Sequence, residues 1–170
     1  MATITVKVIK PKKMNQRAFD SVLLKALAST EKGILKDFTD TTATWKHKPE
    51  FRHGHTLNTT RGTAYTDTQD EIYGYVNDGT RPHPITPKGP WALKFRGGKG
   101  SYRAKTAPRR FGSRPGGPSG PVVYRRSVQH PGTKAREFDK IIAKRWKTLL
   151  PRAMRSALDK GAKASGHGIP

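Results

Sequence analysis

Apolar positions near the start of the chain change from a two-residue to a three- and four-residue spacing. Ile4, Val6 and Val8 alternate with polar residues, which predicts a half-buried strand that ends at Pro11. From about Asn15 onward, apolar side chains recur every three or four positions, which predicts an amphipathic helix. Its apolar face comprises Phe19, Val22, Leu23, Ala26, Leu27, Thr30 and Ile34.

The middle of the chain has the pattern of short strands. From Thr42 to Tyr65, Thr and aromatic residues are interrupted by turn residues, which predicts two or three antiparallel strands. Residues 71–77 alternate at period two and stop at Asp78-Gly79, and they are the strongest strand prediction. Residues 91–95 and 122–128 are two further strand candidates. The segment between them is therefore expected to be the enlarged tip of a hairpin.

A second helix is predicted near the C-terminus. Its apolar positions are Phe138, Ile141, Ile142, Arg145 or Trp146, Leu149 and Leu150. Pro151 is expected either to kink this helix or to open another, with Met154, Ala157 and Leu158 facing inward. Thr133 is the predicted N-cap. The order of elements predicts an α+β fold in one domain, residues 1–170, with a small antiparallel sheet packed with an N-terminal helix and a C-terminal helix.

Composition adds that the core should be small and the surface strongly basic. Only 33% of the residues are hydrophobic, while there are 17 Gly and 13 Pro. The 34 Lys and Arg against 12 Asp and Glu give a formal charge of +22, which favours a polyanionic neighbour such as nucleic acid or an acidic protein surface.

The charge is concentrated in the second half of the chain. Residues 96–120 carry seven basic side chains and no acidic one, among many Gly and Pro. This composition predicts an extended basic Gly/Arg-rich loop or arm that orders only on a partner. Residues 134–163 are a predicted C-terminal basic helical region.

Two classes of protein are disfavoured by what the sequence lacks. The chain has no cysteine, so disulfides and thiolate metal sites are impossible. No stretch has the length of a signal peptide's apolar region or the roughly 20 apolar residues that span a bilayer. We therefore expect a protein that stays in the cytosol until it is assembled, without contact with a membrane.

Candidate chemistry is sparse. His47, Glu50, His53 and His55 could be considered as metal ligands, but surface residues are the favoured interpretation. A ribonuclease-like acid and base pair could be imagined at two His-Pro steps, His83 and His130, with Arg81 as a phosphate clamp. Acids that could orient either imidazole are few in the nearby sequence. No nucleotide-binding loop has the required spacing. We expect no catalytic, metal-binding or cofactor-binding residues, and no enzyme activity.

Two separated motifs carry a resemblance to a known family. Residues 73–88, "YGYVNDGTRPHPITPK", precede a strand candidate, and "VVYRRSVQHPGTKAREF" leads into the last helix. Together they resemble the neck or tail-completion (head-to-tail joining) proteins of long-tailed bacteriophages. The basic insert between the motifs is longer and richer in Arg than is usual there. The resemblance implies a virion structural protein without catalysis, in a ring between portal complex and tail.

The motif residues are the predicted subunit contacts. Pro82, Pro84 and Pro87 fix three φ angles, so this turn should lose little entropy when it docks. The candidates at the subunit interface are Tyr75, Gly79, Thr80, Arg81, Pro82, His83, Pro84, Pro87, Lys88, His130, Pro131, Gly132, Thr133 and Lys134.

Basic side chains of the insert and of the last helix are predicted to face DNA or an acidic partner. Aromatic residues interleaved with Arg could stack on bases while the cations neutralise phosphates without reading sequence. The candidates are Arg96, Lys99, Arg103, Lys105, Arg109, Arg110, Arg114, Lys140, Lys144, Arg145 and Lys147.

The resulting expectation is a subunit of a homo-oligomeric ring, a hexamer or a dodecamer, at the neck or proximal tail of a virion. Its partners would be portal-side adaptor or connector proteins and tail terminator or tail tube proteins, with nonspecific contact to genomic DNA. The alternatives are a sequence-nonspecific nucleic-acid-binding protein of ribosome-associated type, a tail terminator, or a small ribonuclease toxin.

Overall fold

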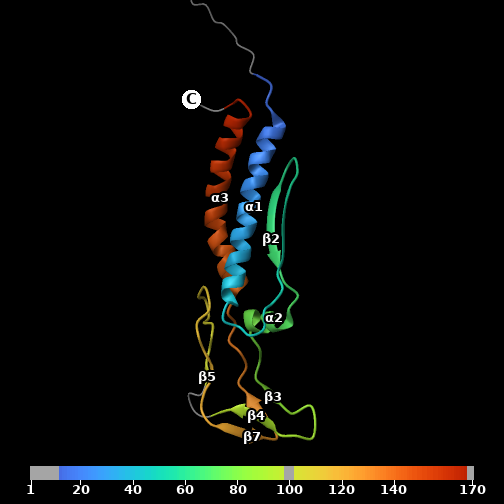
Figure 1. Cartoon of the computed structure of the whole chain (residues 1–170), viewed down its shortest axis with the longest axis vertical. Coiled ribbons are helices and arrows are strands. Elements are labelled where there is room, and N and C mark those ends of the chain that lie inside the picture. The colour runs from blue at the N-terminus through green and yellow to red at the C-terminus, as the bar shows by residue number, and fades with distance from the viewer. Residues whose placement is uncertain (1–11, 98–101, 168–170) are drawn as a thin grey trace, which may run out of the picture.

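Two long antiparallel helices form the body of the molecule. The computed structural model describes residues 12–97 and 102–167. Helix α1 (Gln16–Thr41) and helix α3 (Phe138–Ala164) run side by side along the long axis (Figure 1). A hairpin of β1 (Arg52–Leu57) and β2 (Gly62–Asp67) lies against α1. The predicted N-terminal strand, Ile4 to Val8, lies outside the described residues.

Two residues of helix α1 and its cap, Asn15 and Gly33, explain where the helix begins and how closely α3 packs on it. The side chain of Asn15 caps it by accepting a hydrogen bond from the Ala18 amide at 3.1 Å. Gly33, in the middle of the helix, allows a close approach by α3. A Cβ at this position would stand 2.5 Å from the ring of Trp146. The absence of a side chain at Gly33 therefore lets the indole pack directly on the α1 backbone.

Helix α3 is continuous but starts later than predicted. Its N-cap position is Glu137, which has a left-handed φ of 55° and forms no side-chain cap hydrogen bond. The prediction that Thr133 caps this helix is therefore wrong, because Thr133 pairs with another segment. Pro151 lies inside the helix and does not open a new one. Ala157 is buried as predicted, whereas Leu158 is 47% exposed and does not face inward.

The strongest strand prediction is wrong. Residues Glu71–Asp78 form a helix, α2, whose N-cap Asp70 accepts a hydrogen bond from the Tyr73 amide at 2.7 Å. The alternating pattern also satisfies helical spacing, because Tyr73, Val76 and Asn77 lie three or four positions apart on the face that is turned to the core. The cap and the burial of this face decide the conformation.

The core lies where α2 meets the C-terminal end of α1 and the N-terminal end of α3. Tyr73, Phe138 and Ile142 are buried there, and the rings of Tyr73 and Phe138 are 5.7 Å apart. The partly buried side chains packed around them are Ile34, Phe38, Trp45, Phe51, Val76 and Trp146. The core is small, as the composition predicts, and it is built mostly from aromatic rings.

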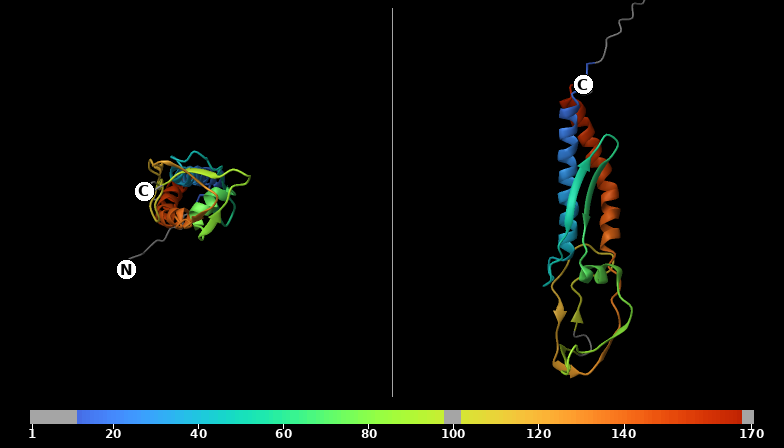
Figure 2. Two further views of the ribbon diagram at one scale, coloured as in Figure 1. Left: turned by 90° about the horizontal axis from the view of Figure 1, so that it is seen from below. Right: turned by 90° about the vertical axis from the view of Figure 1, so that its right-hand side faces the viewer.

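Beyond α2 the chain forms a second part, the lower lobe, which we define as residues 79–136. Its described residues, 79–97 and 102–136, form three ribbons of two strands each. The ribbons lie on the side of α2 away from the long helices (Figures 1 and 2). Strand β3 (His83–Ile85) pairs with β8 (Val128–His130), β4 (Leu93–Arg96) with β7 (Val122–Arg125), and β5 (Tyr102–Arg103) with β6 (Gly117–Pro118). The α+β class is confirmed. The predicted pairing of the strands around the basic insert is also present, whereas the single small sheet is replaced by separate ribbons.

Candidate assembly surfaces

The two motifs that carry the resemblance meet in space. Thr80 and Thr133, 53 residues apart, form an antiparallel bridge with backbone hydrogen bonds of 2.9 and 3.1 Å. The amide of Thr133 also lies 2.9 Å from the hydroxyl of Thr80. We call residues 79–84 and 130–134 the junction, because they join the body to the lower lobe (Figure 1).

Two glycines make this junction possible. Gly79 has a φ of 80°, and a Cβ there would stand 2.6 Å from the carbonyl oxygen of Thr133. Gly132 has a φ of 83°, and its Cβ would stand 2.3 Å from the carbonyl oxygen of Thr80. Both positions combine a left-handed backbone with a close approach to a neighbouring strand, which only glycine accommodates without strain.

The junction also brings His83 and His130 together. They are partners in the β3–β8 register, and their ring centroids are 5.0 Å apart. The Gly132 amide donates to Nδ1 of His130 at 3.0 Å, and Nδ1 of His83 lies 2.8 Å from the Arg81 carbonyl oxygen. Both of these nitrogens are therefore engaged by backbone groups. Among the described residues no carboxylate forms an ion pair with either ring.

The structure divides the predicted interface residues into two groups. The half-buried group comprises Gly79, Thr80, His130, Gly132 and Thr133. Pro87 is also half-buried. The exposed group, which is open to a neighbour, comprises Tyr75, Arg81, Pro82, His83, Pro84, Lys88, Pro131 and Lys134.

Part of the basic insert is held by its own chain, which its composition does not predict. The hydroxyl of Ser113 donates to the Asp40 carbonyl oxygen at 3.2 Å, and Nζ of Lys105 donates to the Thr44 carbonyl oxygen at 2.7 Å. The guanidinium of Arg145 in α3 lies 5.1 Å from the ring centre of Phe111. These contacts attach the insert to the end of α1 and to α3.

The predicted DNA-facing cations likewise have different environments. Glu137 pairs with Lys140 at 2.8 Å and with Arg109 at 3.3 Å, and these hydrogen bonds hold the pKa of Glu137 below its usual value. Arg145 pairs with the buried carboxylate of Asp37 at 2.9 Å. The exposed cations without an ion pair among the described residues are Arg96, Arg103, Arg110, Arg114, Lys144 and Lys147. Lys99 lies outside the described residues.

The whole lower lobe, not only the insert, is free of acidic residues. Residues 79–136 contain 14 of the 34 basic side chains and none of the 12 acidic ones. The lobe also exposes large rings, with Trp91 at 81%, Tyr102 at 67% and Tyr124 at 58%. The absence of Asp and Glu from residues 79–136 is visible in the sequence, but the predicted basic segment covered only residues 96–120. All 12 acidic side chains of the chain therefore lie outside the lobe.

A carboxylate that sequence reasoning missed organises the histidine-rich strand. The Nδ1 atoms of His53 and His55 both hydrogen-bond to the buried carboxylate of Glu31 in α1. The bond from His53 and then that from His55 are the main causes that lower the pKa of Glu31. In residues 12–97 and 102–167 no group of three or more His, Cys, Asp or Glu side chains is arranged to hold a metal ion. The imidazoles instead attach the hairpin to α1.

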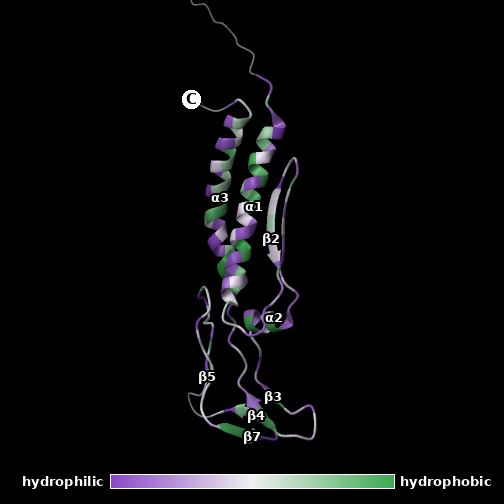
Figure 3. Ribbon diagram, in the orientation of Figure 1, coloured by the Kyte–Doolittle hydropathy of each residue, from purple (hydrophilic) through white to green (hydrophobic). Residues whose placement is uncertain are grey.

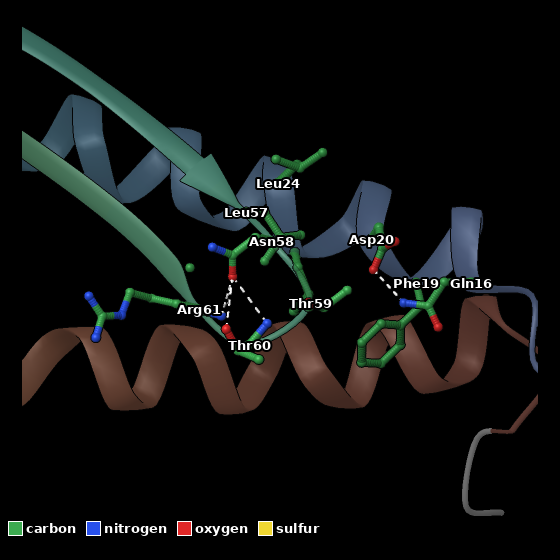
Figure 4. Close-up of a pocket in the computed structure, with 11 residues that line it drawn as sticks. Gln16, Phe19, Asp20, Leu24, Leu57, Asn58, Thr59, Thr60 and Arg61 are labelled. Carbon is green, nitrogen blue, oxygen red and sulfur yellow. Dashed lines mark hydrogen bonds between the residues drawn. The ribbon is translucent and has the colours of Figure 1, made fainter.

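A groove of about 570 Å³ lies between the start of α1 and the hairpin turn (Figure 4). Phe19, Leu23 and Leu24 form its helical side, and Leu57 contributes from β1. The turn is fixed by Asn58, whose side-chain oxygen accepts from the amides of Thr60 and Arg61 at 3.0 and 2.6 Å. The sequence analysis did not predict this groove.

None of the helices in the described part of the chain combines the length and the apolar character needed to cross a membrane. The chain matches no protein-family model, no curated protein and no solved structure.

Proposed function

We propose that this chain is a structural subunit of the neck or tail-completion ring that joins head to tail in a long-tailed bacteriophage. The observation that carries the proposal is the junction. The two motifs that resemble this family pair in space through Thr80 and Thr133, which are 53 positions apart in the sequence. If the two motifs matched the family only by chance, there would be no reason to expect them to pair in the folded chain.

The balance of buried and exposed apolar side chains supports an assembled state. Among the described residues only Leu27, Tyr73, Phe138, Ile142 and Ala157 are buried hydrophobic residues, whereas 14 large hydrophobic residues are exposed. A monomer gains little from so small a core. Repeated interfaces in a ring would bury part of the exposed apolar surface.

The proposed role is architectural. The ring, a hexamer or a dodecamer, would contact portal-side adaptor or connector proteins on one side and tail terminator or tail tube proteins on the other. The chain would reside in the virion neck or proximal tail, and in the host cytoplasm during assembly. In this proposal no residue is catalytic and no cofactor is needed.

Electron microscopy of particles made without this chain tests the proposal. Filled heads and separate tails of normal length are the expected products, and purified protein added to such an extract should restore joined particles. Tails of uncontrolled length would indicate a tail terminator instead. Normally joined, infectious particles would refute a role in joining.

The acid-free lower lobe favours one second candidate, a sequence-nonspecific nucleic-acid-binding protein. Its exposed cations and rings have the composition of a surface that neutralises phosphates and stacks on bases. This candidate predicts tight, salt-sensitive binding of the isolated protein to any RNA or DNA, with no association with heads or tails.

A further inference from the structure

Helix α2 presents an exposed face that nothing in the described part of the chain covers. Glu71, Ile72, Tyr75 and Asp78 recur at helical spacing on the side away from the core, and all four are exposed. Ile72 is 48% exposed and Tyr75 is 56% exposed. Two large apolar side chains are thus bordered by two carboxylates. Neither Glu71 nor Asp78 forms an ion pair among the described residues.

The β4–β7 ribbon presents a face of matching composition and opposite charge. In its register Lys94 is paired with Tyr124 and Arg96 with Val122, so these four side chains share one face of the ribbon. All four are exposed, with Tyr124 at 58% and Val122 at 45%. Lys94 Nζ lies 5.9 Å from the Tyr124 ring centre. Two apolar side chains are here bordered by two cations.

These two faces do not meet within one molecule. Helix α2 lies beside the core, whereas β4 and β7 lie at the far end of the lower lobe in both side views (Figures 1 and 2). Figure 3 shows the same separation in hydropathy, with β7 as a hydrophobic segment remote from the core. An isolated ribbon of two strands is only marginally stable in water, so a partner for its apolar positions would stabilise it.

We propose that the β4–β7 face of one copy docks on the α2 face of the next copy of this chain. The contact joins unlike surfaces, Lys94 and Arg96 to Glu71 and Asp78, with Tyr124 and Val122 against Ile72 and Tyr75. In a dimer formed by this contact, one copy still has a free α2 face and the other still has a free β4–β7 face. Further copies can therefore add in the same way, and the chain of copies closes into a ring if the rotation between neighbours is suitable. The inference rests on the proposed ring and names the surfaces that build it.

Charge indicates which surface of a second copy binds the β4–β7 face. The lower lobe has no acidic residue, so two lobes repel and cannot pair with each other. The α2 face offers carboxylates and exposed apolar side chains together. Exposed lobe cations outside this contact, such as Arg103 and Arg110, remain available to a polyanion.

The absence of native cysteine allows a direct test by cross-linking of the full chain. The variant with Tyr75→Cys and Tyr124→Cys, oxidised at high protein concentration and low salt, should give a ladder of covalent oligomers. The matched control combines Tyr65→Cys with Tyr124→Cys, because Tyr65 is similarly exposed at 48% but lies on β2. A ladder no stronger than that of the control, or a protein that stays monomeric, would overturn the proposal.

Charge exchange provides a second readout that separates this inference from nucleic-acid binding. Reversal in Glu71→Lys/Asp78→Lys, or in Lys94→Glu/Arg96→Glu, should abolish the oligomer in sedimentation velocity, and the combination of all four should restore it. If the Lys94→Glu/Arg96→Glu variant loses binding to a short DNA duplex but keeps the oligomer, the ribbon binds nucleic acid and the inference is wrong.

Failure of this inference and failure of the proposed function have different signatures. A wrong interface leaves the ladder absent while the chain is still required for joining heads to tails. A wrong function leaves joining normal in particles that lack the chain, whatever the cross-linking shows.

Discussion

Gly132 lies so close to Thr80 that a Cβ on the glycine would stand 2.3 Å from the threonine carbonyl oxygen. This approach lets the segment after β8 pair with the segment before β3, and it fixes how the lower lobe leaves the body. The packing of the junction therefore depends on two positions that accept no side chain, Gly79 and Gly132.

Gly132→Ala should destabilise the protein by more than the roughly 1–2 kcal/mol that a left-handed conformation costs an L-residue, because the methyl group also meets backbone atoms. Urea denaturation measures the effect. Gly112→Ala is the matched control, since Gly112 has a φ of 75° with nothing within 4 Å of its added Cβ. Equal losses in the two variants would contradict the proposed close contact.

Asp37 connects α1 with α3 by accepting from Arg145 at 2.9 Å and from the indole of Trp146 at 2.8 Å. Asp37→Ala should lower the free energy of unfolding by about 3–5 kcal/mol, because Arg145 and the Trp146 indole both lose their buried acceptor. Asp40→Ala removes a more exposed carboxylate paired with Lys36 and should cost only about 0.3–0.5 kcal/mol. Similar denaturation midpoints for the two variants would show that the buried pair does not stabilise the helix contact.

Stability should decrease in acid partly through Glu31. Hydrogen bonds from His53 and His55 lower the pKa of Glu31 in the folded protein. Its contribution is therefore fully present above the usual carboxyl pKa, near pH 4, and is lost as pH falls through the lower folded value. Glu31→Gln should flatten this acid limb in urea titrations at several pH values. Glu50→Gln, at an exposed carboxylate, should leave the loss of stability in acid unchanged. If Glu31→Gln loses stability in acid as the wild type does, Glu31 is not the cause.

The basic insert can be shortened without breaking the ribbon that bears it. The Gly97 amide donates to the Pro121 carbonyl oxygen at 3.0 Å, so a short turn can replace residues 98–120. We expect a cooperatively folded protein, because the core and the Asp37 contact are outside this segment. Head-tail joining in extracts should be impaired. Full joining activity of the shortened protein would show that the insert has no role in assembly.

The sequence predicted elements well where one physical signal dominates. The long apolar stripe from Phe19 to Ile34 predicted α1, and the two strands that flank the insert were also predicted. Residues 71–78 failed because their pattern fits both periods. The distinction between them came from the Asp70 cap and from Tyr73 packing on Phe138, a contact across 65 residues that local sequence does not reveal.

The surfaces were predictable only in part, for the same reason. The motif residues were predicted as subunit contacts, which stays a prediction, and their pairing with each other was not predicted. Glu31 was missed because it lies 22 residues before His53 and belongs to another element. The α2 face could not be found while this segment was taken for a strand, since Glu71, Ile72, Tyr75 and Asp78 share a face only in a helix.

An electron cryo-microscopy map of the head-tail joint in mature particles tests the central claim most directly. The account predicts a ring of copies of this chain at the joint, with α1 and α3 visible as a pair of long antiparallel helices in each copy. A joint built entirely of other proteins, in infectious particles from which this chain is missing, would contradict it.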